Sequence, residues 1–128
     1  MDASSTSVVV DIARDFIGLM REVDPAWEKA FHRFRMDGAR YGSNGSYVSS
    51  GKIHLISALQ FAVFYREANE KGLRLLKALG RERGVFLLTI DCEMNYHVDF
   101  EWEDLDKWGI SKIDGESGLP NGLELGVK

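Results

Sequence analysis

The most informative stretch of the chain is Gly84-Val-Phe-Leu-Leu-Thr-Ile-Asp-Cys-Glu-Met-Asn-Tyr-His-Val-Asp-Phe-Glu-Trp-Glu-Asp-Leu-Asp106. Its first part, residues 85–90, is a nearly continuous apolar run, which is typical of a strand buried on both faces. Its second part, residues 96–103, alternates apolar and polar residues, which is typical of a strand with one face in the core. Residues 91–95 supply the polar side chains of a hairpin connection. The stretch therefore predicts a β-hairpin.

The second strand of this hairpin has two predicted faces of opposite character. One face carries four large apolar side chains, and the other carries three carboxylates and a histidine. The apolar residues are Tyr96, Val98, Phe100 and Trp102, and the polar residues are His97, Asp99, Glu101 and Glu103. We expect the aromatic face to pack in the core and the acidic face to point outward.

Two other stretches have the apolar spacing of amphipathic helices. Apolar residues recur every three or four positions in residues 7–23 and again in residues 55–79, which predicts a helix in each. Gly72 is expected to weaken the second helix and to favour a break near it. Residues 1–7 are polar, and we expect them to be disordered.

Three further strands are predicted from shorter apolar patterns that turn signals separate. They are expected at residues 27–36, 40–49 and 52–55, with Asp37-Gly38 and Ser50-Gly51 as the turns between them. Gly42 and Gly45 interrupt the middle strand and predict a bulge or a close backbone approach. Residues 107–122 contain four glycines and a proline beside several apolar residues, so we expect an ordered, glycine-rich loop.

The predicted order of elements is helix, three strands, helix, two strands and loop, within one domain covering residues 1–128. A chain of this length can form a single hydrophobic core without disulfides or metal ions. An antiparallel sheet of about five strands, with the N-terminal helix and the long central helix packed on it, belongs to the α+β class.

The composition is that of an ordinary globular protein, with 45% hydrophobic and 28% charged residues. No apolar run approaches the roughly 20 residues of a membrane helix, and the first residues lack the basic and apolar regions of a secretory signal. The single cysteine, Cys92, cannot form an internal disulfide. These features predict a cytoplasmic protein that does not bind membranes.

Charge is distributed unevenly along the chain. Residues 1–83 contain 13 basic and 10 acidic side chains, a net charge of +3, whereas residues 84–128 contain 3 and 10, a net charge of −7. An acidic surface attracts basic partners and repels phosphate. We therefore predict a basic protein partner and no direct binding of nucleic acid.

His97, Asp99 and Glu101 are residue types that bind divalent metals, and they share one predicted strand face. A small metal-dependent hydrolase using these three residues is therefore an alternative function. Residues two apart on a strand lie roughly 6–7 Å apart, however, which is wide for ligands of one metal ion. We therefore favour a solvated acidic face, or a docking face for a basic protein, with no cofactor, no metal and no catalytic residue.

The remaining residues of chemical interest have simpler interpretations. Cys92 is expected to be a passive thiol, because only His97 is near it in sequence. His32 and His54 lie among apolar neighbours and are expected to be structural. Residues 42–46 match neither the Walker pattern nor the dinucleotide-binding glycine pattern.

Several stretches resemble the family of bacterial immunity proteins typified by YezG. They are Trp27-Glu-Lys-Ala-Phe-His-Arg-Phe34 after an amphipathic helix, Tyr96-His-Val-Asp-Phe-Glu-Trp-Glu-Asp104, and the endings Trp108-Gly-Ile-Ser-Lys-Ile-Asp-Gly115 and Gly118-Leu-Pro-Asn-Gly122. Members of this family protect bacteria from polymorphic toxins, often nucleases, including those of contact-dependent inhibition. The resemblance implies a cytoplasmic antitoxin that is not an enzyme and that binds a cognate toxin domain.

On this interpretation, the acidic surface binds a toxin domain that is basic because it is a nuclease. The expected toxin-binding residues are Glu93, His97, Asp99, Glu101, Glu103, Asp104 and Asp106. Opposite charges on the two proteins would speed their association. A homodimer that uses an exposed sheet edge is a third possibility.

Overall fold

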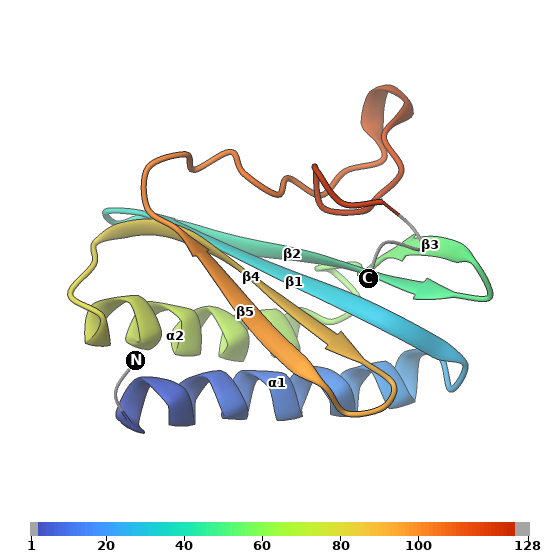
Figure 1. The fold of residues 1–128 in the computed structure, drawn as a ribbon, viewed down its shortest axis with the longest axis horizontal. Coiled ribbons are helices and arrows are strands. Elements are labelled where there is room, and N and C mark those ends of the chain that lie inside the picture. Colours follow the sequence, from blue (N-terminus) through green and yellow to red (C-terminus); the bar gives the residue numbers. More distant parts are fainter. Residues whose placement is uncertain (1–2, 125–128) are drawn as a thin grey trace.

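The computed structural model describes residues 3–124, which form a five-stranded sheet, two α-helices and a short 3₁₀ helix (Figure 1). In chain order, the elements are α1 (Ala3–Val23), β1 (Trp27–Asp37), β2 (Arg40–Ser49), β3 (Lys52–Leu55), α2 (Ala62–Ala78), β4 (Arg83–Asp91), β5 (Tyr96–Glu101) and η1 (Ile113–Gly115). The predicted α+β class is confirmed. Within the described residues, no helix has both the length and the apolar character of a membrane span.

The sheet has the strand order β3-β2-β1-β4-β5, and every neighbouring pair is antiparallel. The predicted hairpin is present as β4 and β5, with Phe86 opposite Phe100 and Leu88 opposite Val98. β4 lies between two other strands and is covered on both faces, which explains its continuous apolar run. β3 and β5 are the edge strands.

The two faces of the sheet are covered by different parts of the chain (Figure 1). Helices α1 and α2 pack on one face, here called the inner face, where Phe16 of α1 and the strand residues Phe34 and Phe86 are buried. The segment after β5 crosses the opposite, outer face.

A second apolar cluster holds that segment on the outer face. Ile110 and Leu119 are buried there against Phe31, Val48 and Leu87 of the sheet. Burial of these side chains explains why a glycine-rich stretch follows the sheet surface instead of extending away from it.

Helix α1 begins earlier than the apolar periodicity predicts. Residues 3–7, which the sequence predicts to be disordered, form its first turns. Ser5 is fully buried, so tertiary packing extends the helix beyond its apolar stripe. Residues 1 and 2 of the predicted disordered segment lie outside the described residues.

Helix α2 begins later than predicted, at residue 62 and not at residue 55. Ile56 is held beside the sheet, because its N–H donates to the Gly45 carbonyl at 2.9 Å and its own carbonyl accepts the Tyr65 hydroxyl at 2.8 Å. Ser57 caps only a turn, with its Oγ accepting the N–H of Gln60 at 3.1 Å. These bonds keep the chain out of the helix until residue 62.

Two glycines mark places where elements approach closely. A Cβ atom at Gly45 would lie 2.8 Å from the backbone oxygen of Phe31, so the close approach predicted for this strand is present. At Gly72 a Cβ atom would lie 2.8 Å from the ring of Phe34. The predicted break near Gly72 is wrong, because α2 continues without interruption through this residue.

Candidate functional site

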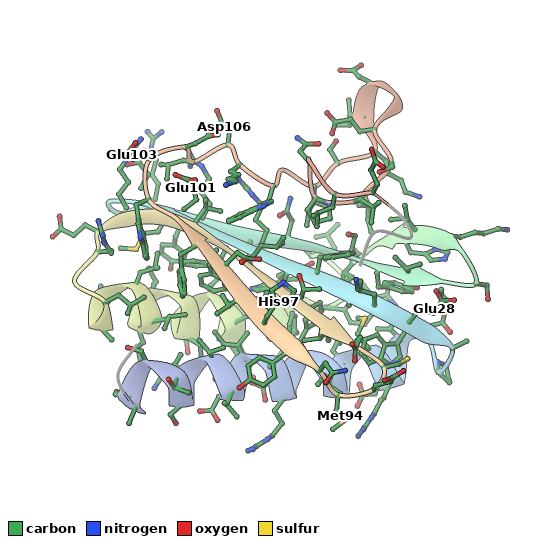
Figure 2. The ribbon with its side chains drawn as sticks, in the orientation of Figure 1. Glu28, Met94, His97, Glu101, Glu103 and Asp106 are labelled. Atoms are coloured by element: carbon green, nitrogen blue, oxygen red, sulfur yellow. The ribbon has the colours of Figure 1, made fainter. Side chains whose placement is uncertain are left out.

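Six of the seven predicted site residues lie on β5 or in the turn that follows it, and Figure 2 labels His97, Glu101, Glu103 and Asp106 among them. Glu93 lies in the β4–β5 connection beside Met94, at the opposite end of β5 from Glu101 and Glu103. The six residues of β5 span about 20 Å at the usual rise per residue. The seven predicted residues therefore form an extended surface and not one compact site.

Glu101 organises residues 101–107, here called the acidic turn. Its carboxylate accepts hydrogen bonds from the backbone N–H groups of Glu103 at 3.1 Å and Asp104 at 3.3 Å, and from Nζ of Lys107 at 3.3 Å. These hydrogen bonds hold the pKa of Glu101 below its usual range, and the bond from Glu103 has the largest effect. They also turn the backbone, so β5 ends at Glu101 and not at Glu103 as predicted.

Two arginines of β1 hold the acidic turn on the outer face. Arg33 donates from Nε to the Lys107 carbonyl at 2.8 Å and from Nη2 to the Leu105 carbonyl at 2.6 Å. Arg35 donates from Nε to the same Leu105 oxygen at 3.2 Å. The turn is therefore attached to the centre of the sheet through its backbone.

Part of the negative charge of the acidic turn lies near arginines of the same molecule. Burial and the neighbouring Arg35 lower the pKa of Arg33, and the carboxylates of Asp106 and Asp104 partly oppose that shift. The acidic turn thus lies near basic groups of the N-terminal half. Some of its negative charge faces the protein's own arginines and not the solvent.

His97 and Asp99 form the exposed middle of the predicted surface. His97 Nε2 and Asp99 Oδ2 are 3.3 Å apart, and the side chains are 65% and 53% exposed. A contact this exposed contributes little to stability. Among residues 3–124, no group of three His, Cys, Asp or Glu side chains is placed to hold a metal ion, so the alternative that uses His97, Asp99 and Glu101 gains no support.

Asp99, Glu103, Asp104 and Asp106 are exposed, and they differ in how far they are used within the protein. Asp104 accepts the backbone N–H of Asp106 at 3.1 Å. In the described part of the chain, no hydrogen bond or ion pair involves the Glu103 carboxylate. Within the described residues, the Asp99 carboxylate has a polar contact only with the exposed His97, so Asp99 and Glu103 are placed to meet a partner.

Three arginines near this surface are absent from the predicted site. Arg33, Arg35 and Arg40 lie on the outer face of β1 and β2 and line one pocket with Gly42 and Asn44. Arg33 and Arg35 occupy alternate positions of a strand, which is the sequence signal for two side chains on one face. Arg40 joins them only through the pairing of β1 with β2.

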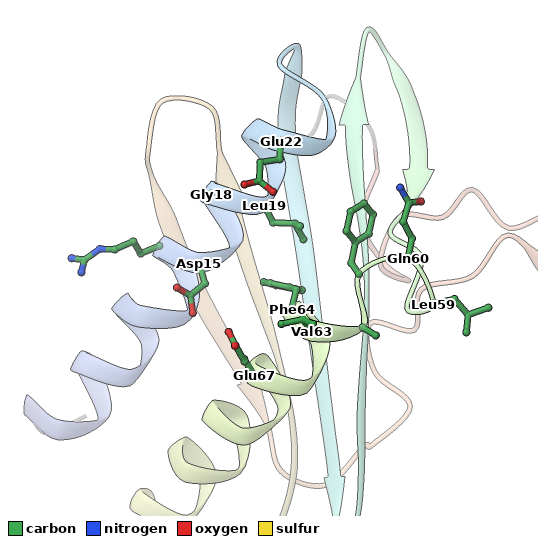
Figure 3. A pocket seen from close by; sticks show the side chains of 12 residues that line it. Asp15, Gly18, Leu19, Glu22, Leu59, Gln60, Val63, Phe64 and Glu67 are labelled. Carbon is green, nitrogen blue, oxygen red and sulfur yellow. The ribbon is translucent and has the colours of Figure 1, made fainter.

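An open groove lies on the other side of the molecule, between α1 and the start of α2 (Figure 3). Its volume is about 600 Å³. Leu59 and Val63 at this groove are exposed, Leu59 by 96%, and Glu22 and Glu67 also line it. The groove is a second surface with mixed apolar and acidic character.

A search against models of known protein families found no match, and neither did a search of curated proteins. The resemblance to immunity proteins of the YezG type therefore remains a prediction.

Replacing Glu101 with alanine is expected to loosen the acidic turn, because two backbone N–H groups and one ammonium group lose their acceptor. Hydrogen exchange should become faster at the backbone amides of Glu103 and Asp104. The matched control is Glu103→Ala, whose carboxylate is unused within the protein. Equal exchange rates in the two variants would show that Glu101 does not hold the turn.

Proposed function

We propose that this protein is an immunity protein that binds and neutralises a cognate toxin domain through the exposed carboxylates of β5 and the acidic turn. The observation that carries the proposal is the position of Asp99 and Glu103, which are exposed on an edge strand and in the turn that follows it. Carboxylates placed in this way can meet a basic surface without any rearrangement of the core.

The edge strand itself supports binding of a protein partner. β5 pairs with β4 on one side only, so its other side has backbone groups that a partner strand can reach. Tyr96, at the start of β5, is 43% exposed. Exposed aromatic residues beside charged groups are common in protein interfaces.

A nuclease is the toxin class that fits best. Nucleases need basic surfaces to hold the phosphates of their substrates, and an acidic inhibitor associates quickly with such a surface. The protein would act in the cytoplasm and without catalysis of its own. Affinity capture with the tagged protein should recover a basic toxin domain encoded next to its own reading frame, and the complex should weaken as salt rises.

Reversing two charges on the proposed surface, Asp99→Lys with Glu103→Lys, is expected to slow association with that toxin domain by about tenfold or more at low salt. Neither carboxylate holds the acidic turn, so the fold should be retained. Stopped-flow association kinetics at several salt concentrations measure the effect, and near-ultraviolet circular dichroism checks the fold.

The matched control is the double variant Glu22→Lys with Glu67→Lys, which makes the same change in net charge at the groove between α1 and α2. Its association rate should change much less than that of the first variant. Similar slowing in both would indicate a general charge effect. Slowing in the control alone would move the toxin-binding surface to the groove and overturn the proposal.

A further inference from the structure

A cationic pocket lies on the outer face of the sheet, where β1 and β2 approach their connecting turn. Its volume is about 320 Å³, and no carboxylate is among the residues that line it. Arg35 lies opposite Gly42 in the ladder, and Arg33 lies opposite Asn44. Arg40 lies on the same face two residues before Gly42. The strand register thus brings three arginine residues to the lining of one hollow, here called the arginine pocket.

In the part of the chain that the structure describes, no carboxylate forms an ion pair within 4.0 Å with Arg33, Arg35 or Arg40. Asp106 and Asp104 nevertheless act electrostatically on Arg33, and Asp106 lines the adjoining pocket. Arg33 and Arg35 are instead oriented by backbone carbonyls of the acidic turn. These acceptors are neutral, so their hydrogen bonds do not cancel the positive charges of the two arginines.

The floor of the arginine pocket is open because Gly42 has no side chain. A Cβ atom built at Gly42 would meet nothing within 4 Å. Asn44 forms part of the wall and is held by a bond from its Nδ2 to the Ile110 carbonyl at 3.1 Å. Its Oδ1 is buried and has no hydrogen-bond partner among the described residues.

We propose that the arginine pocket binds the phosphate group of a small ligand. Guanidinium groups present paired N–H donors that match the oxygens of phosphate. A carboxylate carries one charge and is satisfied by one arginine, whereas three convergent arginines suit a dianion. The phosphate is either free or carried by a phosphomonoester. This inference does not depend on binding of a toxin.

Isothermal titration calorimetry of the full chain with inorganic phosphate and with a nucleoside monophosphate, at constant ionic strength, tests the proposal. We expect one binding site, with tighter binding of the nucleotide if the natural ligand is an ester and equal binding if it is the free ion. Arg40→Gln should weaken binding by about tenfold, the effect of losing one charge-assisted contact. In the described part of the chain, the Arg40 side chain forms no hydrogen bond or ion pair, so this change should leave the fold intact.

Gly42→Val provides a second and independent variant. Valine favours strands and would fill the open floor of the pocket, so binding of both probes should be lost while the protein stays folded. The control, Arg66→Gln on α2, removes the same charge from an exposed position away from the pocket and should bind as the parent protein does. Absence of binding by the parent protein, or equal weakening in Arg66→Gln and Arg40→Gln, would overturn the proposal.

Discussion

Replacing Gly72 with alanine should lower the free energy of unfolding by about 1–3 kcal/mol, although alanine normally stabilises a helix interior by about 1 kcal/mol over glycine. The new Cβ atom would lie 2.8–2.9 Å from three ring atoms of Phe34. That ring is fully buried and stacks on Phe86 at 5.4 Å between ring centroids. It therefore has no open space into which to move.

Gly18 provides the matched control for this prediction, because it is the glycine inside the other helix. It faces the open groove, and a Cβ atom there would meet nothing within 4 Å (Figure 3). Gly18→Ala should therefore raise the free energy of unfolding by up to about 1 kcal/mol. Urea denaturation of the two variants measures both changes, which should have opposite signs.

A second substitution tests the cause of the loss. Phe34→Leu removes the ring that the new methyl group meets, so Gly72→Ala should cost less when it is made in that background. An equal cost in both backgrounds, or a stabilising effect of Gly72→Ala alone, would show that the contact with Phe34 does not decide the outcome. In that case α2 would be able to move away from the sheet enough to make room for the methyl group.

The fold was predictable from the sequence where local patterns coincide with tertiary packing. The apolar patterns correctly predict strands at residues 85–90 and 96–101. A strand buried on both faces has a continuous apolar run, whereas a strand with one face in the core alternates apolar and polar residues. The ends of elements were not predictable in the same way. Ile56 stays out of α2 because of bonds to Gly45 and Tyr65, and such bonds between distant residues leave no local signal.

The candidate surface was predictable only in part, for a similar physical reason. The alternation along β5 correctly places His97 and Asp99 on the outward face. It does not reveal that the Glu101 carboxylate is used by backbone groups two and three residues later. It also does not reveal that Arg33 and Arg35 of β1 are bonded to the acidic turn. That arrangement depends on the pairing of β1 with β4 and of β4 with β5.

Lowering the pH from about 6.5 to about 4 should cost about 3 kcal/mol of folding free energy through His32 alone. His32 is fully buried, and burial lowers its pKa from 6.5 to about 4. Its ring lies 5.8 Å from that of Phe16 and 5.9 Å from that of Phe64. Neither ring nitrogen has a hydrogen-bond partner among the described residues, so nothing nearby stabilises the charged form.

The direction of this dependence follows from the two protonation equilibria. In the unfolded chain His32 binds a proton as the pH falls through 6.5, whereas the folded protein keeps it neutral until the pH approaches 4. Protonation therefore stabilises the unfolded state relative to the folded state across this window. The free energy of unfolding keeps its full contribution from His32 above pH 6.5 and falls as the pH drops below that value. It changes no further through His32 below pH 4, where both states are protonated.

His32→Leu should remove this component of the pH dependence. It should also raise stability near neutral pH, because leucine has a similar size and buries no unpaired nitrogen. Urea denaturation between pH 4 and pH 7 measures the difference between the parent protein and the variant, so that contributions of carboxylates cancel. The difference should widen by about 3 kcal/mol as the pH falls.

His97→Gln is the control for this experiment, because the His97 side chain is 65% exposed and its replacement should leave the pH profile nearly unchanged. Parallel profiles for the parent protein and His32→Leu would mean that the folded protein accommodates a charged His32. Solvent or a polar group would then have to reach the ring between Phe16 and Phe64. The inner face of the sheet would in that case open on acidification, before the protein unfolds as a whole.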